Sequence, residues 1–444
     1  MPVNYLFPKL AINMAGITMF ILLVSLLNGV FCDGSGSVQP SVVFEWETVD
    51  MDWPNDTIKQ EYYQGNKYQP RNNGINGIKL YKGDVYLTIP KLKDGIPFSL
   101  VKVVKDGTNS PLLQPYPTWD IHMDGDCSNL KLVQSMEIDP YTGYMWIIDT
   151  SFVPRGPVNI ADSCPKKLVI WDLVRNTEIH RYSFPSSVIG QGMSYLNDIV
   201  IDFDTNKTAR WAYISDTLGK KLVVYDRLLD DSWAFSHESM NPVGQYSNIT
   251  IGNVTSDYGV LGINGIALSS DFRYVYYCPV AGIMLYRVST KVLRNKKTLD
   301  TVFAGDVKAV GNKQYQSDGI YYGQKHNLYY SAQGPRSVFK WPIEFGDGHV
   351  VLADHSSSVA AHSKIEWIDS LAFDDDGFLW FVTNNLNTFF SEDGENGTSN
   401  YFVWKVYVND YSYLKFGEDT SAAVFHVLSI TVLVFSCAMF ILAF

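Results

Sequence analysis

The chain of 444 residues lacks the local clusters that identify many enzymes and nucleic-acid-binding proteins. Its 35 Lys and Arg residues form no basic block and are outnumbered by 46 Asp and Glu, so nucleic acid is not expected as a partner. None of the eight His residues forms a His-x-x-x-His pair or lies beside a Gly-x-Ser-x-Gly motif. The five cysteines do not come in the close pairs that a zinc finger requires, which excludes that kind of metal site.

The N-terminal end carries a long run without charge. This run, from Leu10 to Leu27, follows Lys9 and precedes small residues around Cys32. A basic residue, an apolar run and small residues in this order predict a secretory signal over residues 1–32. A signal that remains attached as a membrane anchor is the alternative.

The C-terminal end is also apolar. Residues 422–444 contain no Lys, Arg, Asp or Glu and are long enough to cross a bilayer. We expect them to be a glycolipid-anchor signal or a membrane-spanning tail, preceded by a polar spacer over residues 410–421. For a glycolipid, the sequence favours attachment near Asn409–Ser412, with Gly417 and Ser421 as alternatives. Either form of attachment predicts a secreted protein, tethered to the outer cell surface.

Five Asn-x-Ser/Thr sequons agree with an extracellular location. They begin at Asn55, Asn206, Asn248, Asn253 and Asn396.

Three cysteines remain once Cys32 at the predicted cleavage point and Cys437 in the apolar tail are set aside. An oxidising compartment favours a disulfide between Cys127 and Cys164. Cys278 follows two tyrosines within an apolar run, which predicts a buried free thiol.

Six similar segments recur along the chain at intervals of 51 to 67 residues. Each begins with a polar residue, a small or acidic residue, and Ile, Leu or Met, and an aromatic-rich run follows about a dozen residues later. The polar first positions are Asn76, Gln134, Asn197, Asn264, Asp318 and Asp369. Repeats of this length with several strands each are typical of propeller blades. We therefore predict an all-β, six-bladed β-propeller over residues 42–409, closed around a central channel.

Connections between the predicted blades are long in two places, residues 105–130 and 232–262. Such connections gather at one mouth of a propeller channel, where they can wall a pocket. A short helix is expected within residues 57–68.

The closed ring predicts that the six polar first positions meet on its axis. Four amides and two carboxylates would then face one channel, with Asp318 and Asp369 on adjacent blades. This set of oxygen atoms favours a small cation, either a protonated amine or Ca²⁺. Channel linings in propellers are often only solvated, so a water-filled axis is the alternative.

Several long strings resemble the Yellow / major royal jelly protein family of secreted insect proteins, from about Val43 to Val408. They include FEWETVDMDWPND ahead of the first blade, YISDTLGKKLVVYDRLLDDSWAFSHESMNP in the middle, and DSLAFDDDGFLWFVTNNL near the end. The resemblance implies a six-bladed propeller, which we expect to be a monomer. Two further cysteines that the family often has are absent here, which again leaves Cys127 with Cys164.

The resemblance also implies a ligand, because family members in blood-feeding insects resemble binders of biogenic amines. Asn384 matches a family Asn after the last aromatic strand, and Thr383 stands beside it. The expected ligand-binding set is therefore the six axial residues with Thr383 and Asn384. The aromatic residues Tyr116, Trp119 and Phe152 would cover an amine or, on the alternative reading, only pack.

Two further functions stay open. Some Yellow relatives resemble dopachrome-converting isomerases, and propellers with Asn/Asp rings around calcium resemble lactonases; Asp318 or Asp369 would be the general base. A structural or signalling glycoprotein is the third alternative. Asp149 and Asp216, which end two aromatic runs, would face the channel or bind backbone N–H groups.

Overall fold

The computed structural model describes residues 39–123, 125–151, 164–190, 194–346, 349–352, 356–389 and 401–416. The predicted signal over residues 1–32, the apolar tail 422–444, Asn396 and Phe152 lie outside these residues. Within these ranges, no helix is both long and apolar enough to span a membrane.

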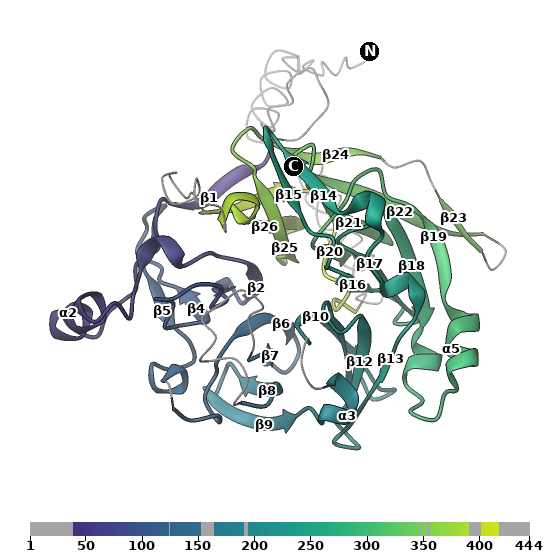
Figure 1. Cartoon of the computed structure of the whole chain (residues 1–444), viewed down its shortest axis with the longest axis horizontal. Coiled ribbons are helices and arrows are strands. Elements are labelled where there is room, and N and C mark those ends of the chain that lie inside the picture. Colours follow the sequence, from purple (N-terminus) through teal and green to yellow (C-terminus); the bar gives the residue numbers. More distant parts are fainter. Residues whose placement is uncertain are drawn as a thin grey trace, which may run out of the picture. The chain divides into compact units, whose positions relative to one another are not determined.

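Six antiparallel sheets surround one axis, and each forms a blade of a β-propeller (Figure 1). The innermost strands of neighbouring blades contact one another in cyclic order, and those of the first and sixth blades also meet. The predicted six-bladed propeller is confirmed.

Each blade begins at the axis and runs outwards. The innermost strands are β2 (Gly77–Tyr81), β6 (Val133–Asp139), β10 (Leu196–Phe203), β16 (Ile263–Leu268), β20 (Ile320–Tyr322) and β25 (Trp367–Phe373). The second strands are β3 (Asp84–Thr88), β7 (Tyr144–Asp149), β11 (Ala209–Asp216), β17 (Tyr274–Pro279), β21 (Asn327–Ala332) and β26 (Phe378–Asn384). The third strands are β4 (Leu100–Val103), β8 (Lys167–Asp172), β12 (Lys221–Asp226), β18 (Met284–Ser289), β22 (Ser337–Gly346) and β27 (Tyr401–Tyr407). The outer strands are β5 (Leu113–Pro115), β9 (Thr177–Ser183), β13 (Asp231–Phe235), β19 (Lys308–Asn312), β24 (Ser356–Ala361) and β1 (Ser41–Trp46). A further strand, β23 (His349–Leu352), pairs with the far end of β22.

The ring is closed within the sixth blade. Strand β1 pairs with β27, with Trp46 opposite Tyr401. The string FEWETVD, which the sequence places ahead of the first blade, therefore begins in the outer strand of the sixth.

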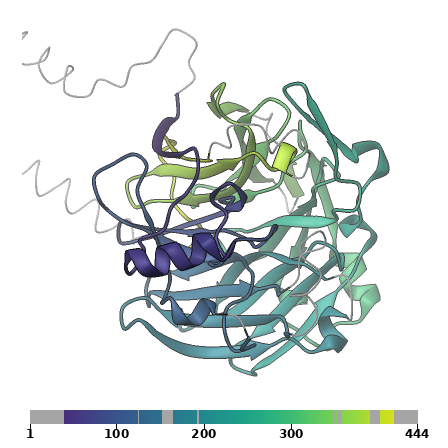
Figure 2. The same cartoon turned by 60° about the vertical axis from the view of Figure 1, so that its left-hand side comes forward.

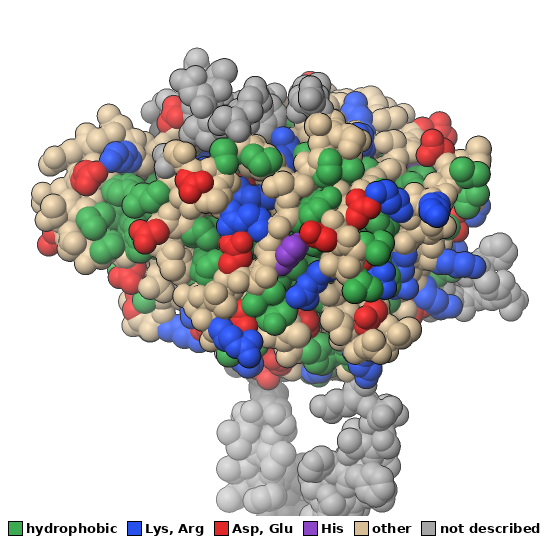
Figure 3. Space-filling view, turned by 90° about the horizontal axis from the view of Figure 1, so that it is seen from below, with side chains coloured by type: hydrophobic (Ala, Val, Ile, Leu, Met, Phe, Trp, Pro, Cys, Tyr) green, Lys and Arg blue, Asp and Glu red, His purple; other side chains and the backbone are tan. Residues whose placement is uncertain are grey.

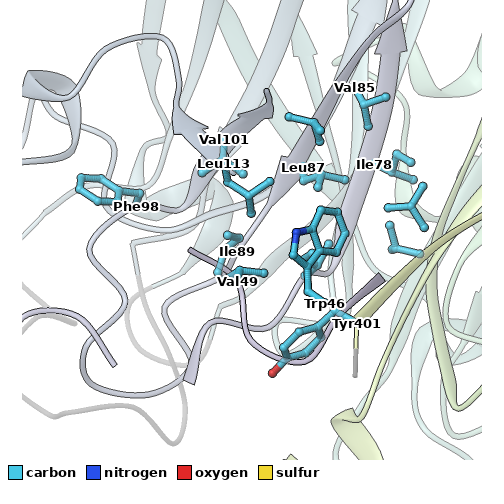
Figure 4. Packing of buried hydrophobic residues seen from close by; sticks show 14 of the residues in the cluster. Trp46, Val49, Ile78, Val85, Leu87, Ile89, Phe98, Val101, Leu113 and Tyr401 are labelled. Carbon is cyan, nitrogen blue, oxygen red and sulfur yellow. The ribbon is translucent and has the colours of Figure 1, made fainter. Parts of the chain in front are cut away.

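Apolar side chains fill the space between blades. All residues of β7 except the first are buried, as expected for a strand covered on both faces. Figure 4 shows the cluster between blades one and six, where Trp46 and Tyr401 lie beside Leu87 and Ile78. Burying each such side chain contributes roughly 1.5–3 kcal/mol, which explains how repeated aromatic runs hold the ring together.

The predicted short helix is confirmed as α2 (Asp56–Gln64), which lies outside the ring (Figures 1 and 2). Asn55 caps it by accepting a 2.9 Å hydrogen bond from the Ile58 N–H. The remaining short helices are α3 (Ser186–Ile189), α4 (Thr290–Leu293), α5 (Asp300–Asp306) and α6 (Leu386–Phe389). The long connection 232–262 carries a hairpin of β14 (Asn248–Ile251) and β15 (Val254–Asp257).

The C-terminal segment Asp410–Phe416 closes the channel at the end where the innermost strands finish. The buried Tyr413 hydroxyl accepts a 3.0 Å hydrogen bond from the Ile201 N–H, and it lies 3.4 Å from Glu137 Oε2. Phe416 stacks on Tyr141 with ring centroids 4.8 Å apart.

Residues 410–416, predicted as part of a polar spacer, therefore belong to the propeller. The Asp410 carboxylate is fully buried and accepts hydrogen bonds from the Lys325 N–H and the Asn327 amide. The polar side chain of Asp410 thus forms hydrogen bonds with residues of the ring, and Tyr413 and Leu414 are buried. Glycolipid attachment within Asn409–Ser412 would detach this segment, which argues against that site.

The covalent and surface features agree with several of the sequence predictions. Cys127 and Cys164 form the predicted disulfide, and Cys278 is a buried free thiol. The four sequon asparagines within the described ranges are all exposed, namely Asn55, Asn206, Asn248 and Asn253. On the face shown in Figure 3, acidic and basic side chains are interspersed.

Candidate functional site

A cavity of about 170 Å³ lies at the end of the channel where the innermost strands begin. Its lining includes all six polar first positions of the repeats: Asn76, Gln134, Asn197, Asn264, Asp318 and Asp369. The structure thus brings together residues that are up to 293 positions apart in the sequence.

β-Bulges at the start of innermost strands turn the first residues of the repeat towards the axis. The pairing with the second strand shifts at the start of β6, β10, β16 and β25. A bulge re-aims side chains, so two consecutive residues can face the channel. Neighbouring strands also approach closely here, because a Cβ on Gly265 or Gly319 would overlap the backbone oxygen of Asp318 or Asp369. This explains the small second residue of the repeat in those blades.

Two carboxyl groups on adjacent blades dominate the electrostatics of the cavity. Asp318 Oδ2 accepts a 2.7 Å hydrogen bond from the Trp367 indole, and burial raises the Asp318 pKa to about 7. Burial, followed by the charge of Asp318, raises the pKa of Asp369 well above its usual value. Because two carboxylates on adjacent blades of one cavity repel each other when both are ionised, the pair holds at least one proton at neutral pH.

The amides of the ring are held by one another and by their neighbours. The Asn197 amide donates to Asn264 Oδ1, and the Tyr195 hydroxyl donates to Gln134 Oε1 at 2.6 Å. These contacts fix the orientation of the amides, so that they present a set arrangement of donors and acceptors to the cavity.

A smaller chamber of about 30 Å³ lies deeper in the channel and shares Asp318 and Asp369 with the upper cavity. Its additional carboxyl group is Asp198, which accepts hydrogen bonds from Ser135 Oγ at 3.2 Å and the Ile266 N–H at 3.3 Å. Burial raises the Asp198 pKa to about 6, although the nearby ammonium of Lys79 opposes the shift. Sequence reasoning missed this residue, although it is the acidic second position of the third repeat.

Below that chamber, Lys79 forms a buried 3.0 Å ion pair with Glu137. The Lys79 ammonium also lies 4.6 Å from the centre of the Tyr321 ring. This pair and Tyr413 separate the chamber from the far end of the channel, so the cavity is approached from the end where the strands begin.

The walls of the upper cavity are mainly apolar, and sequence reasoning missed most of them. The aromatic members are Tyr195, Tyr258 and Trp367, and the aliphatic members are Leu92, Leu218, Val260, Leu261 and Leu386. Tyr258, Val260 and Leu261 come from the 232–262 connection, which walls the mouth as predicted. The described residues of the other long connection, 105–130, do not contribute to the lining.

Of the two residues carried over by resemblance, only Asn384 approaches the ring. Its amide donates to the Ile75 backbone oxygen at 2.9 Å and lies 3.5 Å from Asp369 Oδ2. The Thr383 hydroxyl instead accepts a 2.9 Å hydrogen bond from the Trp404 indole. Successive residues of a strand point to opposite faces, so Thr383 faces away from the ring that Asn384 borders, and its part in ligand binding stays a prediction.

The other acidic residues considered from the sequence have structural roles. Asp149 accepts hydrogen bonds from the Lys131 and Leu132 N–H groups and pairs with Lys167 at 2.7 Å. Asp216 accepts the Tyr195 N–H at 2.8 Å and so helps to position a residue of the cavity wall.

The two described aromatic residues of the 105–130 connection pack and do not cover the cavity. Tyr116 lies edge-on to Tyr86 with ring centroids 5.0 Å apart, and Trp119 packs against Phe98 at 4.6 Å.

In the described part of the chain, no group of three or more His, Cys, Asp or Glu side chains is arranged to hold a metal ion. The axial ring could offer Ca²⁺ two carboxylates and amide oxygens. A bound Ca²⁺ would itself favour ionisation of both carboxyl groups, so binding of the ion would release protons from the pair.

A family model described as "Major royal jelly protein" matches residues 133–413, from the second blade to the C-terminal segment. "Protein yellow" of Drosophila melanogaster is 31% identical over 261 residues, which cover 57% of this chain and 48% of that protein. "Protein yellow" of Drosophila guanche is 28% identical over 289 residues, or 63% of this chain and 50% of that protein. The chain thus matches about half the length of these relatives. Among solved structures, a luciferin-regenerating enzyme covers 77% of this chain and 93% of its own at 13% identity, with a TM-score of 0.43.

Proposed function

The chain belongs to the major royal jelly protein family, and on this basis we propose that it is an extracellular binding protein that holds a small amine cation in its axial cavity. The observation that carries the proposal is the pair of carboxyl groups, Asp318 and Asp369, in a cavity whose other walls are mainly apolar. The pair lines both the upper cavity and the deep chamber, which places it below the apolar walls.

This arrangement suits a ligand with a charged end and an apolar body. An ammonium group donates up to three hydrogen bonds, and carboxylate and amide oxygens accept them. Moving the ammonium out of water is costly unless such partners replace the lost hydration. The rings of Tyr195, Tyr258 and Trp367 favour a flat, aromatic body at the other end, since aromatic pairs gain energy beyond area burial.

Calorimetry with serotonin, dopamine and histamine tests the proposal, with uncharged indole as the ligand control. We expect micromolar binding of at least one amine, weakened roughly tenfold or more by Asp318→Asn, because a buried charged hydrogen bond is worth about 1.5–3 kcal/mol. Asp376→Asn, at an exposed carboxylate in a turn of the neighbouring blade, is the matched control.

Two results would decide against amine binding. One is the absence of heat with every amine at a concentration where the folded protein is intact. The other is heat with Ca²⁺ alone that Asp369→Asn abolishes, which would assign the ring to a metal ion.

Proton transfer is a second candidate function, favoured by the Asp318 pKa of about 7. A general acid or base works best when its pKa lies near the operating pH, and isomerisation of dopachrome requires such a group. Loss of dopachrome absorbance faster than the buffer control, abolished by Asp318→Asn, would support this function. An unchanged rate would leave binding as the role of the carboxyl pair.

The extracellular location is part of the proposal. The Cys127–Cys164 disulfide supports it, because disulfides persist in oxidising compartments. Tethering through residues 422–444 rests on their apolar sequence alone. Release from intact cells by phosphatidylinositol-specific phospholipase C would support a glycolipid, and retention would favour a membrane-spanning tail.

A further inference from the structure

The hairpin β14–β15 is an insertion between blades three and four, and its two faces differ in character. Ile249 and Ile251 are 2% and 1% exposed, whereas Asn248, which precedes them, and Thr250, which lies between them, are exposed. Alternation of this kind shows that one face of the ribbon is covered and the other faces solvent.

The covered face packs on residues that also form the wall of the cavity. Ile249 and Ile251 lie in one apolar cluster with Trp367, Tyr258, Leu261 and Leu386. These last four residues line the upper cavity, and the rings of Tyr258 and Trp367 lie 4.8 Å apart. The covered face of the hairpin therefore belongs to the same apolar cluster as this part of the cavity wall.

The hairpin is fastened to blades far from its own position in the chain. Ser256 Oγ donates a 2.8 Å hydrogen bond to the backbone oxygen of Asn387 in the sixth blade. At its base, the backbone oxygen of Tyr246 accepts a 2.6 Å hydrogen bond from the Gln316 side-chain amide, just before the fifth blade. The ribbon thus reaches from blades three and four across to blades five and six (Figure 1).

We propose that the β14–β15 hairpin is the specificity-determining roof of the axial cavity, which seats Tyr258, Leu261 and Trp367 against the apolar end of the ligand. This inference rests on the proposed function for the identity of the ligand, a small amine with a flat apolar body. The roof and the carboxyl pair then select the two ends of the ligand separately.

The roof has two consequences for binding. An amine without an apolar body gains nothing from the residues that the hairpin seats, so it binds weakly even though its charge is matched. A ligand that occupies the cavity leaves past these residues, so loosening them raises the dissociation rate more than it changes association.

Accessibility of the cavity tests the roof without any ligand. A cysteine placed by Leu218→Cys lies in the cavity wall, and its alkylation by a bulky maleimide reports how well the cavity is covered. We expect Ile249→Ala and Ile251→Ala each to speed this labelling severalfold, since each removes buried apolar contacts from the roof. Val254→Ala on the same hairpin is the matched control, because Val254 is 36% exposed. None of the three changes removes a sequon. If the Ile249→Ala, Ile251→Ala and Val254→Ala variants are all labelled at the same rate, the proposal that the hairpin covers the cavity is wrong.

Binding kinetics test its role in specificity. In the two Ile variants we expect roughly tenfold weaker serotonin binding, mostly through faster dissociation, with an unchanged dependence on pH. Wild-type affinity and dissociation in both variants would contradict the inference while leaving amine binding intact. If the wild type binds no amine, the proposed function fails, and the labelling rates still decide whether the hairpin covers the cavity.

Discussion

The Trp367 indole donates a 2.7 Å hydrogen bond to Oδ2 of Asp318, and so joins the apolar wall of the cavity to its carboxyl pair. This bond favours the ionised form of Asp318, while burial raises the pKa of both carboxyl groups. The Trp367 indole lies 2.7 Å from Asp318, whereas the Asn384 amide lies 3.5 Å from Asp369, so the charge of the pair is better held on Asp318 when a cation binds.

Amine binding should depend on pH through this pair. A cation favours the ionised carboxylate, so binding releases a proton while Asp318 is protonated, and affinity falls as the pH drops below about 7. For one released proton the fall approaches about tenfold per pH unit. Calorimetry at pH 6 in two buffers of different ionisation enthalpy measures the released protons. If almost no protons are released, the ammonium group of the ligand does not bind to the Asp318–Asp369 pair.

Replacing the indole donor should shift this dependence. Trp367→Phe keeps an aromatic ring but removes the hydrogen bond, so the pKa of Asp318 should rise. The pH at which affinity begins to fall should then rise by about one to two units, because a charged hydrogen bond is worth roughly 1.5–3 kcal/mol and one pKa unit corresponds to about 1.4 kcal/mol. Trp380→Phe, whose indole bonds the Asp374 side chain in a turn, is the matched control. If affinity depends on pH in the same way in both variants, the Trp367 hydrogen bond does not control the pKa of Asp318.

Asp198 should lower stability at neutral pH. Its pKa is raised to about 6 in the folded protein, so the folded state binds more protons than the unfolded state between pH 4 and 6. The free energy of unfolding therefore falls as pH rises through this window. Asp198→Asn does not titrate, and its stability relative to wild type should rise by roughly 1–3 kcal/mol from pH 4 to pH 7. Urea unfolding at both values checks this, with Asp375→Asn as an exposed control.

The C-terminal segment should be required for stability. Tyr413 is 1% exposed beneath the channel, so Tyr413→Ala should lower the free energy of unfolding by about 3–5 kcal/mol. Tyr413→Phe should cost about 0.5–1.5 kcal/mol, since it loses only the hydroxyl contacts. Denaturant unfolding measures both, and Tyr407→Ala, at a 47% exposed tyrosine, is the control. Equal stability of the two alanine variants would show that the segment is dispensable.

Reduction of the disulfide should also destabilise the fold. Cys127 and Cys164 are separated by 37 positions, and closing a loop of this size stabilises by roughly 3–4 kcal/mol on the chain-entropy model. The double variant Cys127→Ala/Cys164→Ala should show this loss in thermal unfolding. Cys278→Ala, at a buried thiol outside the bond, controls for the loss of a cysteine.

The repeat made the axial residues predictable, because a ring places equivalent positions of every blade around one axis. The roof residues Tyr258 and Leu261 had no such signal, since they lie on an insertion that the other blades do not share. The bulges that turn Asp198 to the axis arise from strand pairing, which a local pattern does not show. Likewise the pairing of β1 with β27, between opposite ends of the chain, depends on ring closure.

A crystal structure with 5-bromotryptamine tests the central claim most directly, since bromine is located by its anomalous scattering. The account predicts a bromine peak against Tyr258 and Trp367, with the ammonium about 3 Å from the carboxyl oxygens of Asp318 or Asp369. A bromine peak outside the axial cavity, or an ammonium with no contact to either carboxyl group, would contradict it.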